Sequence, residues 1–129
     1  MSAGMASIVI PCHGGLLYTA LCLESIARHT PEPHEVIVVD NGCVDGTGGW
    51  CAERGARVVR SPVNLGFAGG VNLGLAAMRG DVAVLLNNDA LATPGWLRGM
   101  TGALGRVRHA GIVGPRSNWV SDDQIVTGV

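Results

Sequence analysis

The chain has 129 residues, enough for one domain and too few for two of ordinary size. It is 47% hydrophobic and 15% charged, a composition that excludes a disordered chain or a polyelectrolyte. Nine basic residues against ten acidic ones give a net charge of −1, and all nine are arginine. We therefore expect no nucleic-acid partner, no Walker A phosphate loop and no lysine-based catalysis.

Membrane and zinc-binding signals are missing from the sequence. No apolar run approaches the roughly 18 residues of a membrane span, and the first residues do not form a secretory signal. We expect a cytoplasmic chain without a transmembrane segment. The cysteines lack the C-x-x-C spacing of a structural zinc site, and we interpret all four as reduced, mostly buried thiols: Cys12, Cys22, Cys43 and Cys51.

The first third of the chain predicts a β-α-β unit. Residues 7–11 are apolar on both faces and end in a proline, which predicts a central strand. A second apolar block at 35–40 predicts a parallel neighbour, reached by a right-handed crossover. Between them, apolar residues at helical spacing predict a helix that ends before Pro31 and has as its inner face Leu16, Ala20, Leu23 and Ala27.

The alternation of strands and helices continues along the chain. Asp45 can cap a short helix through about Arg54, and residues 56–60 and 81–86 predict two further strands. The helix between these strands has its inner face marked by Val71, Leu75 and Met78. A last helix is expected after a capping hydroxyl and a first-turn proline, Thr93 and Pro94. This pattern predicts an α/β fold with an open, mostly parallel sheet and helices on both faces.

Ligands of such sheets bind beyond the carboxyl ends of the strands, and the polar residues of this sequence gather there. The candidate binding residues follow the four predicted strands in turn: Pro11 and His13; Asp40, Asn41 and Gly42; Gly66 and Asn72; Asn87, Asn88 and Asp89. The dinucleotide fingerprint G-x-G-x-x-G is absent after the first strand. His13 is alternatively a surface or packing residue.

Three of these groups suggest particular chemistry. Residues 87–89 supply amide and carboxylate oxygens that suit Mg²⁺ or Mn²⁺ bridging a substrate diphosphate, or else form a solvated turn with a helix cap. Asp40 can accept hydrogen bonds from a ribose hydroxyl or a base N–H. The glycine-rich stretch 64–72 can face a diphosphate with its amides, or can serve close helix-to-sheet packing.

Together these segments resemble family 2 glycosyltransferases with the GT-A fold, of the rhamnosyltransferase-like kind, over about residues 7–118. The matching segments are 8–11, 38–47, 64–74, 85–90 and 94–97. The resemblance implies a nucleotide-sugar donor, UDP- or dTDP-linked, and a function in cell-wall or polysaccharide biosynthesis. It places Pro11 at the nucleobase pocket, Asp40 at the base or ribose, and Asp89 as the metal ligand.

The sequence departs from the family pattern in three places. Val71 stands where many relatives carry an arginine, and Asn87 replaces the first aspartate of the D-x-D metal motif. Cys43 stands where relatives often have serine, and we interpret it as a small structural substitute. The general base of the family is not identifiable, and we interpret Asp122 and Asp123 as part of a solvated loop.

We therefore expect residues 1–129 to be a single nucleotide-sugar-binding domain that is cut short on its C-terminal side. The exposed sheet edge that this leaves predicts a homo-oligomer. Two alternatives stay open: a non-catalytic nucleotide-sugar-binding module, and a nucleotidyltransferase-like enzyme, whose usual glycine-rich loop with Arg and Lys is absent here. The catalytic residues stay unknown.

Overall fold

The computed structural model describes residues 4–115, which belong to two compact units divided between residues 94 and 95. The first unit holds a four-stranded sheet of order β3-β2-β1-β4, in which every pairing is parallel. Its elements in chain order are β1 (Ala6–Cys12), α1 (Leu16–His29), β2 (His34–Asn41), α2 (Thr47–Glu53), β3 (Arg57–Ser61), α3 (Gly66–Ala77) and β4 (Val82–Leu85).

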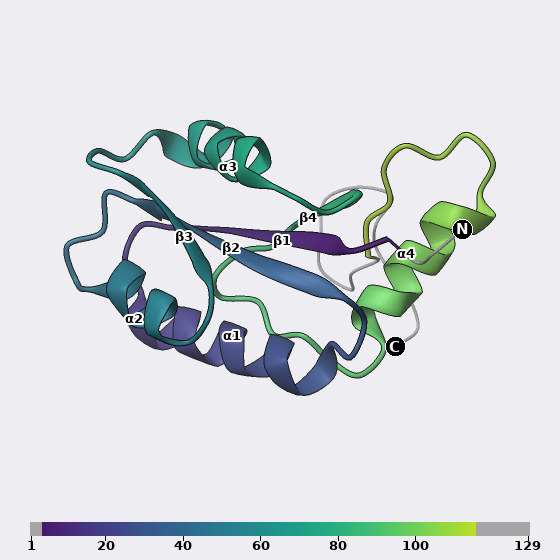
Figure 1. Cartoon of the computed structure of the whole chain (residues 1–129), viewed down its shortest axis with the longest axis horizontal. Coiled ribbons are helices and arrows are strands. Elements are labelled where there is room, and N and C mark those ends of the chain that lie inside the picture. Colours follow the sequence, from purple (N-terminus) through teal and green to yellow (C-terminus); the bar gives the residue numbers. More distant parts are fainter. Residues whose placement is uncertain (1–3, 116–129) are drawn as a thin grey trace, which may run out of the picture. The chain divides into compact units, whose positions relative to one another are not determined.

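The predicted open parallel sheet with helices is confirmed. Figure 1 shows α1 and α2 on one face of the sheet and α3 on the other. Strand β1 is central, between β2 and β4, and its residues Ile8, Val9 and Ile10 are fully buried. A strand covered on both faces is apolar throughout because neither face meets water, which is why 7–11 shows no alternation.

Helix α1 ends before Pro31 as expected, but its inner face differs from the predicted one. The buried residues are Thr19, Cys22 and Ile26, whereas Ala27 is exposed. Leucines occur all around this helix, so apolar spacing alone did not single out one face. Contacts with distant segments set the face instead. The hydroxyl of Thr19, for example, accepts a hydrogen bond from the side chain of Asn88 at 3.1 Å.

Helix α3 lies close to the sheet because its inner face is made of small residues. Gly70, Val71 and Gly74 are its buried residues, and a side chain at Gly74 would collide with Val9 and come within 3.1 Å of Val39. The predicted contacts Leu75 and Met78 are only half-buried at the edge of this core, with Met78 just beyond the helix. Close packing therefore accounts for part of the glycine-rich stretch.

The described part of the second unit contains one helix, α4 (Trp96–Arg106). The predicted cap at Thr93 and Pro94 is wrong, since the helix is preceded by Gly95 with φ 76° and ψ 6°. These angles are those of the third residue of a type II turn, where Pro-Gly is a favoured pair. Pro94 therefore belongs to a turn before the helix, not to its first turn. Within residues 4–115, no helix is long and apolar enough to cross a bilayer.

Candidate functional site

The order of the strands creates a switch point between β1 and β4. The chain leaves β1 toward β2 on one side and reaches β4 on the other, so the loops after these two strands diverge there. Asn88 spans this point, because its side-chain amide donates to the carbonyl oxygen of Gly14 at 3.2 Å as well as to Thr19. Asn88 therefore holds the loop after β4 against the loop after β1.

The loop after β1 is also tied to the loop after β2. The Nδ1 of His13 lies 2.8 Å from the carbonyl oxygen of Asn41, so this nitrogen carries the proton and donates it. Cys43 accepts from the backbone N–H of Gly14 at 3.1 Å and donates to the carbonyl oxygen of Cys12 at 3.3 Å. A serine can make the same pair of bonds, in agreement with the interpretation of Cys43 as a structural substitute.

Asn41 fastens the start of α3. Its Oδ1 accepts from the backbone N–H of Leu65 at 2.8 Å, and its Nδ2 donates to the carbonyl oxygen of Gly66 at 3.0 Å. The side chain is buried and both its polar atoms are used. Asn41 and Asn88, two candidate ligand-binding residues, thus shape the loops of this edge through their own hydrogen bonds.

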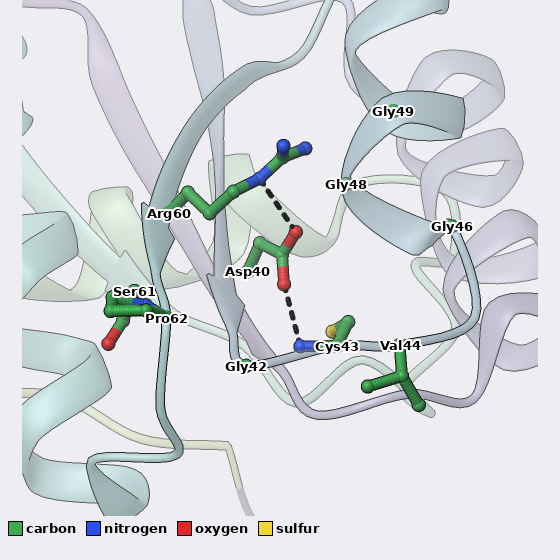
Figure 2. Close-up of a pocket in the computed structure, with 10 residues that line it drawn as sticks. All are labelled: Asp40, Gly42, Cys43, Val44, Gly46, Gly48, Gly49, Arg60, Ser61 and Pro62. Atoms are coloured by element: carbon green, nitrogen blue, oxygen red, sulfur yellow. Dashed lines mark hydrogen bonds and ion pairs between the residues drawn. The ribbon is translucent and has the colours of Figure 1, made fainter.

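Asp40 lies at the end of β2, in the wall of a cavity of about 290 Å³. Its Oδ1 accepts from the backbone N–H of Cys43 at 2.9 Å, and its Oδ2 lies 3.1 Å from Nε of Arg60 (Figure 2). The carboxylate is buried, with 7% of its side chain exposed, whereas 65% of the Arg60 side chain is exposed. The pair therefore joins a buried anion to a cation that reaches solvent.

Four glycines line this cavity, and Gly48 of α2 has a particular reason to be one. A side chain at Gly48 would collide with Oδ2 of Asp40 and come within 2.9 Å of an Nη atom of Arg60. The start of α2 is stabilised from Asp45, whose Oδ1 accepts from the N–H and the hydroxyl of Thr47. The predicted cap is therefore displaced by one residue: Gly46 is the N-cap, and Asp45 stands just before it.

The residues predicted to bind metal follow β4. Asp89 is exposed and makes no hydrogen bond or ion pair within residues 4–115. The negative charge of Asp89 affects the thiol of Cys22. The pKa of this thiol is raised to about 11, mainly by burial and to a smaller extent by Asp89. In the described part of the chain, no three His, Cys, Asp or Glu side chains come together as a ready-made metal site.

The remaining candidate residues also lie at the carboxyl edge of the sheet. Pro11 is half-buried at the end of β1, beneath Gly70 of α3. Gly66 begins α3 in a left-handed conformation with φ 75°, and Asn72 is exposed six residues further along the helix. Val71 is buried against the sheet. The roles of all these residues in binding a ligand stay predictions.

The cysteines are free thiols, of which Cys12, Cys22 and Cys51 are buried and Cys43 is half-buried. Burial raises the pKa of Cys12 to about 12 and that of Cys51 to about 11. The pKa of Cys43 is also raised, by burial and by its neighbour Asp40. All four thiols therefore stay protonated at neutral pH, as hydrogen-bonding and packing groups.

Sequence reasoning missed Arg60 and Gly48. Arg60 lies opposite Asp40 in the parallel register of β2 and β3, which no local pattern in the sequence reveals. An arginine at the carboxyl end of a strand, facing a loop with several glycines, was the available signal. Asp122 and Asp123, interpreted from the sequence as part of a solvated loop, lie outside the described residues.

Comparison with known proteins identifies the family to which this chain belongs. The profile of Glycosyl transferase family 2 matches residues 7–124. An uncharacterised protein of Sinorhizobium fredii, y4gI, is 32% identical over 133 residues, covering 84% of this chain and 15% of that protein. An uncharacterised glycosyltransferase of Haemophilus influenzae is 24% identical over 115 residues, covering 85% of this chain and 36% of its own length.

Solved structures agree on the fold. The mannosyltransferase PcManGT of Pyrobaculum calidifontis, in complex with GDP-Man and Mn²⁺, superimposes with a TM-score of 0.71 at 22% identity, covering 78% of this chain and 32% of that one. TarS of S. aureus in complex with UDP-GlcNAc gives 0.70 at 18% identity, covering 85% and 37%.

The chain therefore belongs to glycosyltransferase family 2, and its sheet is that of the GT-A fold. It spans less than two fifths of the length of each of these relatives.

Proposed function

We propose that this chain binds a nucleoside-diphosphate sugar at the carboxyl edge of its sheet, with Mg²⁺ or Mn²⁺, for transfer of the sugar to an acceptor. One observation carries the proposal: in a family 2 chain, the loops after β1, β2 and β4 meet around the switch point of the sheet. The complexes of PcManGT with GDP-Man and of TarS with UDP-GlcNAc support a nucleotide sugar as the class of ligand.

Asp89 suits a divalent cation that is shared with the substrate. Mg²⁺ usually keeps several waters and is bound by one or two carboxylates together with substrate phosphates, so a lone exposed carboxylate is sufficient on the protein side. Such a cation would supply positive charge that stabilises the departing diphosphate. The neighbouring Asn87 is exposed as well and would offer a neutral oxygen ligand.

The other residues position the donor. Asp40 and Gly42 would face the nucleoside, and Asn41 and Asn88 would keep the surrounding loops in place through the bonds already described. Pro11, His13, Gly66 and Asn72 would border the same edge.

Among the carboxylates at this edge within residues 4–115, none is free to act as the general base. Asp40 is paired with Arg60, and Asp45 accepts hydrogen bonds from Thr47 and from the backbone N–H of Leu16. Asp89 is assigned to the metal. General-base catalysis contributes about 10²–10⁴-fold, so we propose that the 129 residues alone bind the donor without transferring the sugar at a useful rate.

Calorimetry with UDP, dTDP and GDP, each with and without Mn²⁺, tests donor binding. We expect Mn²⁺-dependent binding of at least one nucleotide that is lost in Asp89→Ala. The matched control is Asp81→Ala, which removes an exposed carboxylate at the other end of β4. Heat from none of the nucleotides, or equal binding by the two variants, contradicts the proposal.

The lack of a free carboxylate base within residues 4–115 favours one second candidate, a nucleotide-sugar-binding module without turnover. The two functions differ in what becomes of the donor. Slow release of free sugar from a bound nucleotide sugar, abolished in Asp89→Ala, supports the transferase; a donor that stays intact over days supports the module.

A further inference from the structure

Helix α1 turns a row of hydroxyl and thiol side chains toward the loop that follows β4. This polar row consists of Thr19, Cys22 and Ser25, spaced three residues apart, and the first two are fully buried. Apolar packing alone does not account for the choice, because Leu17 and Leu21 of the same helix are 70% and 47% exposed. Burying a polar group costs free energy unless it finds a partner. Each member of the polar row has a partner in the loop after β4.

The two hydroxyls of the polar row are arranged in the same way. Each donates its own proton to a carbonyl oxygen of the preceding turn, at 3.2 Å for Thr19 and 2.7 Å for Ser25. Each then accepts from the loop: Thr19 from the side-chain amide of Asn88 at 3.1 Å, and Ser25 from the backbone N–H of Ala92 at 2.8 Å. Because their protons are used within the helix, both hydroxyls face the loop as acceptors.

The thiol between them acts as a donor. Cys22 donates to the backbone carbonyl oxygen of Asn87 at 3.8 Å. This proton stays in place at neutral pH, because burial and the charge of Asp89 raise the pKa of the thiol to about 11. The polar row therefore holds the loop at three points, residues 87, 88 and 92.

The loop between these contacts forms a tight turn that includes Asp89. The backbone N–H of Ala90 donates to the carbonyl oxygen of Asn87 at 3.1 Å, which closes a β-turn with Asn88 and Asp89 as its central residues. In the part of the chain that the structure describes, the carboxylate of Asp89 makes no hydrogen bond or ion pair of its own. Asp89 is therefore an uncommitted side chain on a backbone that is fastened on both sides.

We propose that the polar row of α1 positions Asp89 for the divalent cation of the proposed function. A carboxylate on a loosely held loop would lose conformational freedom on binding, and this entropy cost would weaken the affinity. The polar row imposes the order before any ligand arrives. Thr19, Cys22 and Ser25 are thus positioning residues, which act on the cation only through the loop. This inference rests on the proposed function.

The test measures how much Mn²⁺ strengthens nucleotide binding. Calorimetry gives the dissociation constant of UDP, dTDP or GDP, whichever the chain binds best, in EDTA and in Mn²⁺, and the ratio of the two values is the gain from the metal. Thr19→Val keeps the shape of the side chain but removes the acceptor for Asn88. We expect this gain to fall by about tenfold, as when a metal ligand loses a group that orients it, with the constant in EDTA unchanged.

Three further variants make the test specific. Thr19→Ser retains the hydroxyl and should retain the full gain. Ser25→Ala removes the acceptor for Ala92 from a half-buried position and should reduce the gain by a smaller factor. The matched control is Thr101→Val, which removes a hydroxyl that bonds to carbonyl oxygens of α4 and should leave the gain unchanged. Thermal unfolding shows whether each variant is folded.

Hydrogen exchange examines the same fastening in the free chain, without nucleotide or metal. The N–H groups of Ala90 and Ala92 should exchange faster in Thr19→Val and in Ser25→Ala than in the wild type, because the turn around Asp89 opens more often. In Thr19→Ser they should exchange at the wild-type rate.

Three results would overturn the inference. If Thr19→Val and Ser25→Ala keep the wild-type gain while Asp89→Ala loses it, the polar row does not position the metal ligand and the proposed function stands. Equal weakening in EDTA and in Mn²⁺ by Thr19→Val shows a purely structural role. Failure of the wild-type chain to bind any of the three nucleotides removes the proposed function and this inference together.

Discussion

Strands β2 and β3 are joined by two arginine–carboxylate pairs, Glu35 with Arg57 near their amino ends and Asp40 with Arg60 at their carboxyl ends. The residue types match, and both carboxylates are largely buried, with 12% and 7% of their side chains exposed. The arginines differ, because 34% of Arg57 is exposed but 65% of Arg60.

The carboxylate of the first pair accepts more hydrogen bonds than that of the second. Glu35 accepts from the hydroxyl of Ser7, from the backbone N–H of Arg79 and from Arg57, and Arg57 also donates to the carbonyl oxygen of Ala77 at 2.8 Å. This cluster connects β1, β2, β3 and the segment after α3. In the second pair, Asp40 accepts from the backbone N–H of Cys43 and contacts Arg60. The comparison teaches that two pairs of the same residue types differ in how many segments their carboxylate joins.

The largest expected effect is that of Glu35→Ala on stability. The change leaves Arg57, Ser7 and the N–H of Arg79 without their shared acceptor, and removing one partner of a buried pair costs about 3–5 kcal/mol. Urea unfolding should show this loss, whereas Glu24→Ala, in an exposed i,i+4 pair, should cost under about 1 kcal/mol. Similar costs in the two variants would contradict the structural role of Glu35.

The next effect is the dependence of stability on pH. Burial alone would raise the pKa of Glu35, but hydrogen bonds from Ser7, Arg79 and Arg57 and the charge of Arg57 lower it from 4.5 to about 2. A carboxyl with a lowered pKa stabilises the fold fully above pH 4.5, and this contribution is lost as the pH falls toward 2. The shift corresponds to about 3 kcal/mol.

Urea unfolding between pH 7 and pH 2.5 measures this dependence. Glu35→Gln should be the less stable chain at pH 7, and the gap to the wild type should narrow as the pH falls. A gap that stays constant over this range would show that Glu35 does not titrate with the lowered pKa.

The smallest effects separate the two arginines. Arg57→Gln should cost about 1–3 kcal/mol, because the hydrogen bonds of its guanidinium to Glu35 and to the carbonyl oxygen of Ala77 are both lost. Arg60→Gln should cost under about 1 kcal/mol, because a largely exposed guanidinium gives up a single contact. Urea unfolding of the two variants, measured in parallel, checks this order, and equal costs would contradict it.

Local patterns in the sequence determined the alternation of strands and helices, the buried central strand and the placing of Asp40 and Asp89 at one edge of the sheet. These features follow from short-range rules. A doubly covered strand must be apolar throughout, and parallel strands joined by crossovers end at the same edge. The resemblance to glycosyltransferase family 2 further predicted the GT-A fold, and the comparisons confirmed it.

Tertiary structure alone decided the details that depend on partners distant in the sequence. The register that sets Arg60 against Asp40, the inward turn of Thr19 and Cys22 on α1, and the contact of Gly74 with Val9 each join segments far apart in the chain. Apolar spacing cannot choose among the several faces of α1 that carry leucine. The sequence of one strand likewise does not reveal which residue of the neighbouring strand will lie opposite each of its own residues. Packing makes these choices, because only one arrangement fills the core and satisfies the buried polar groups at the same time.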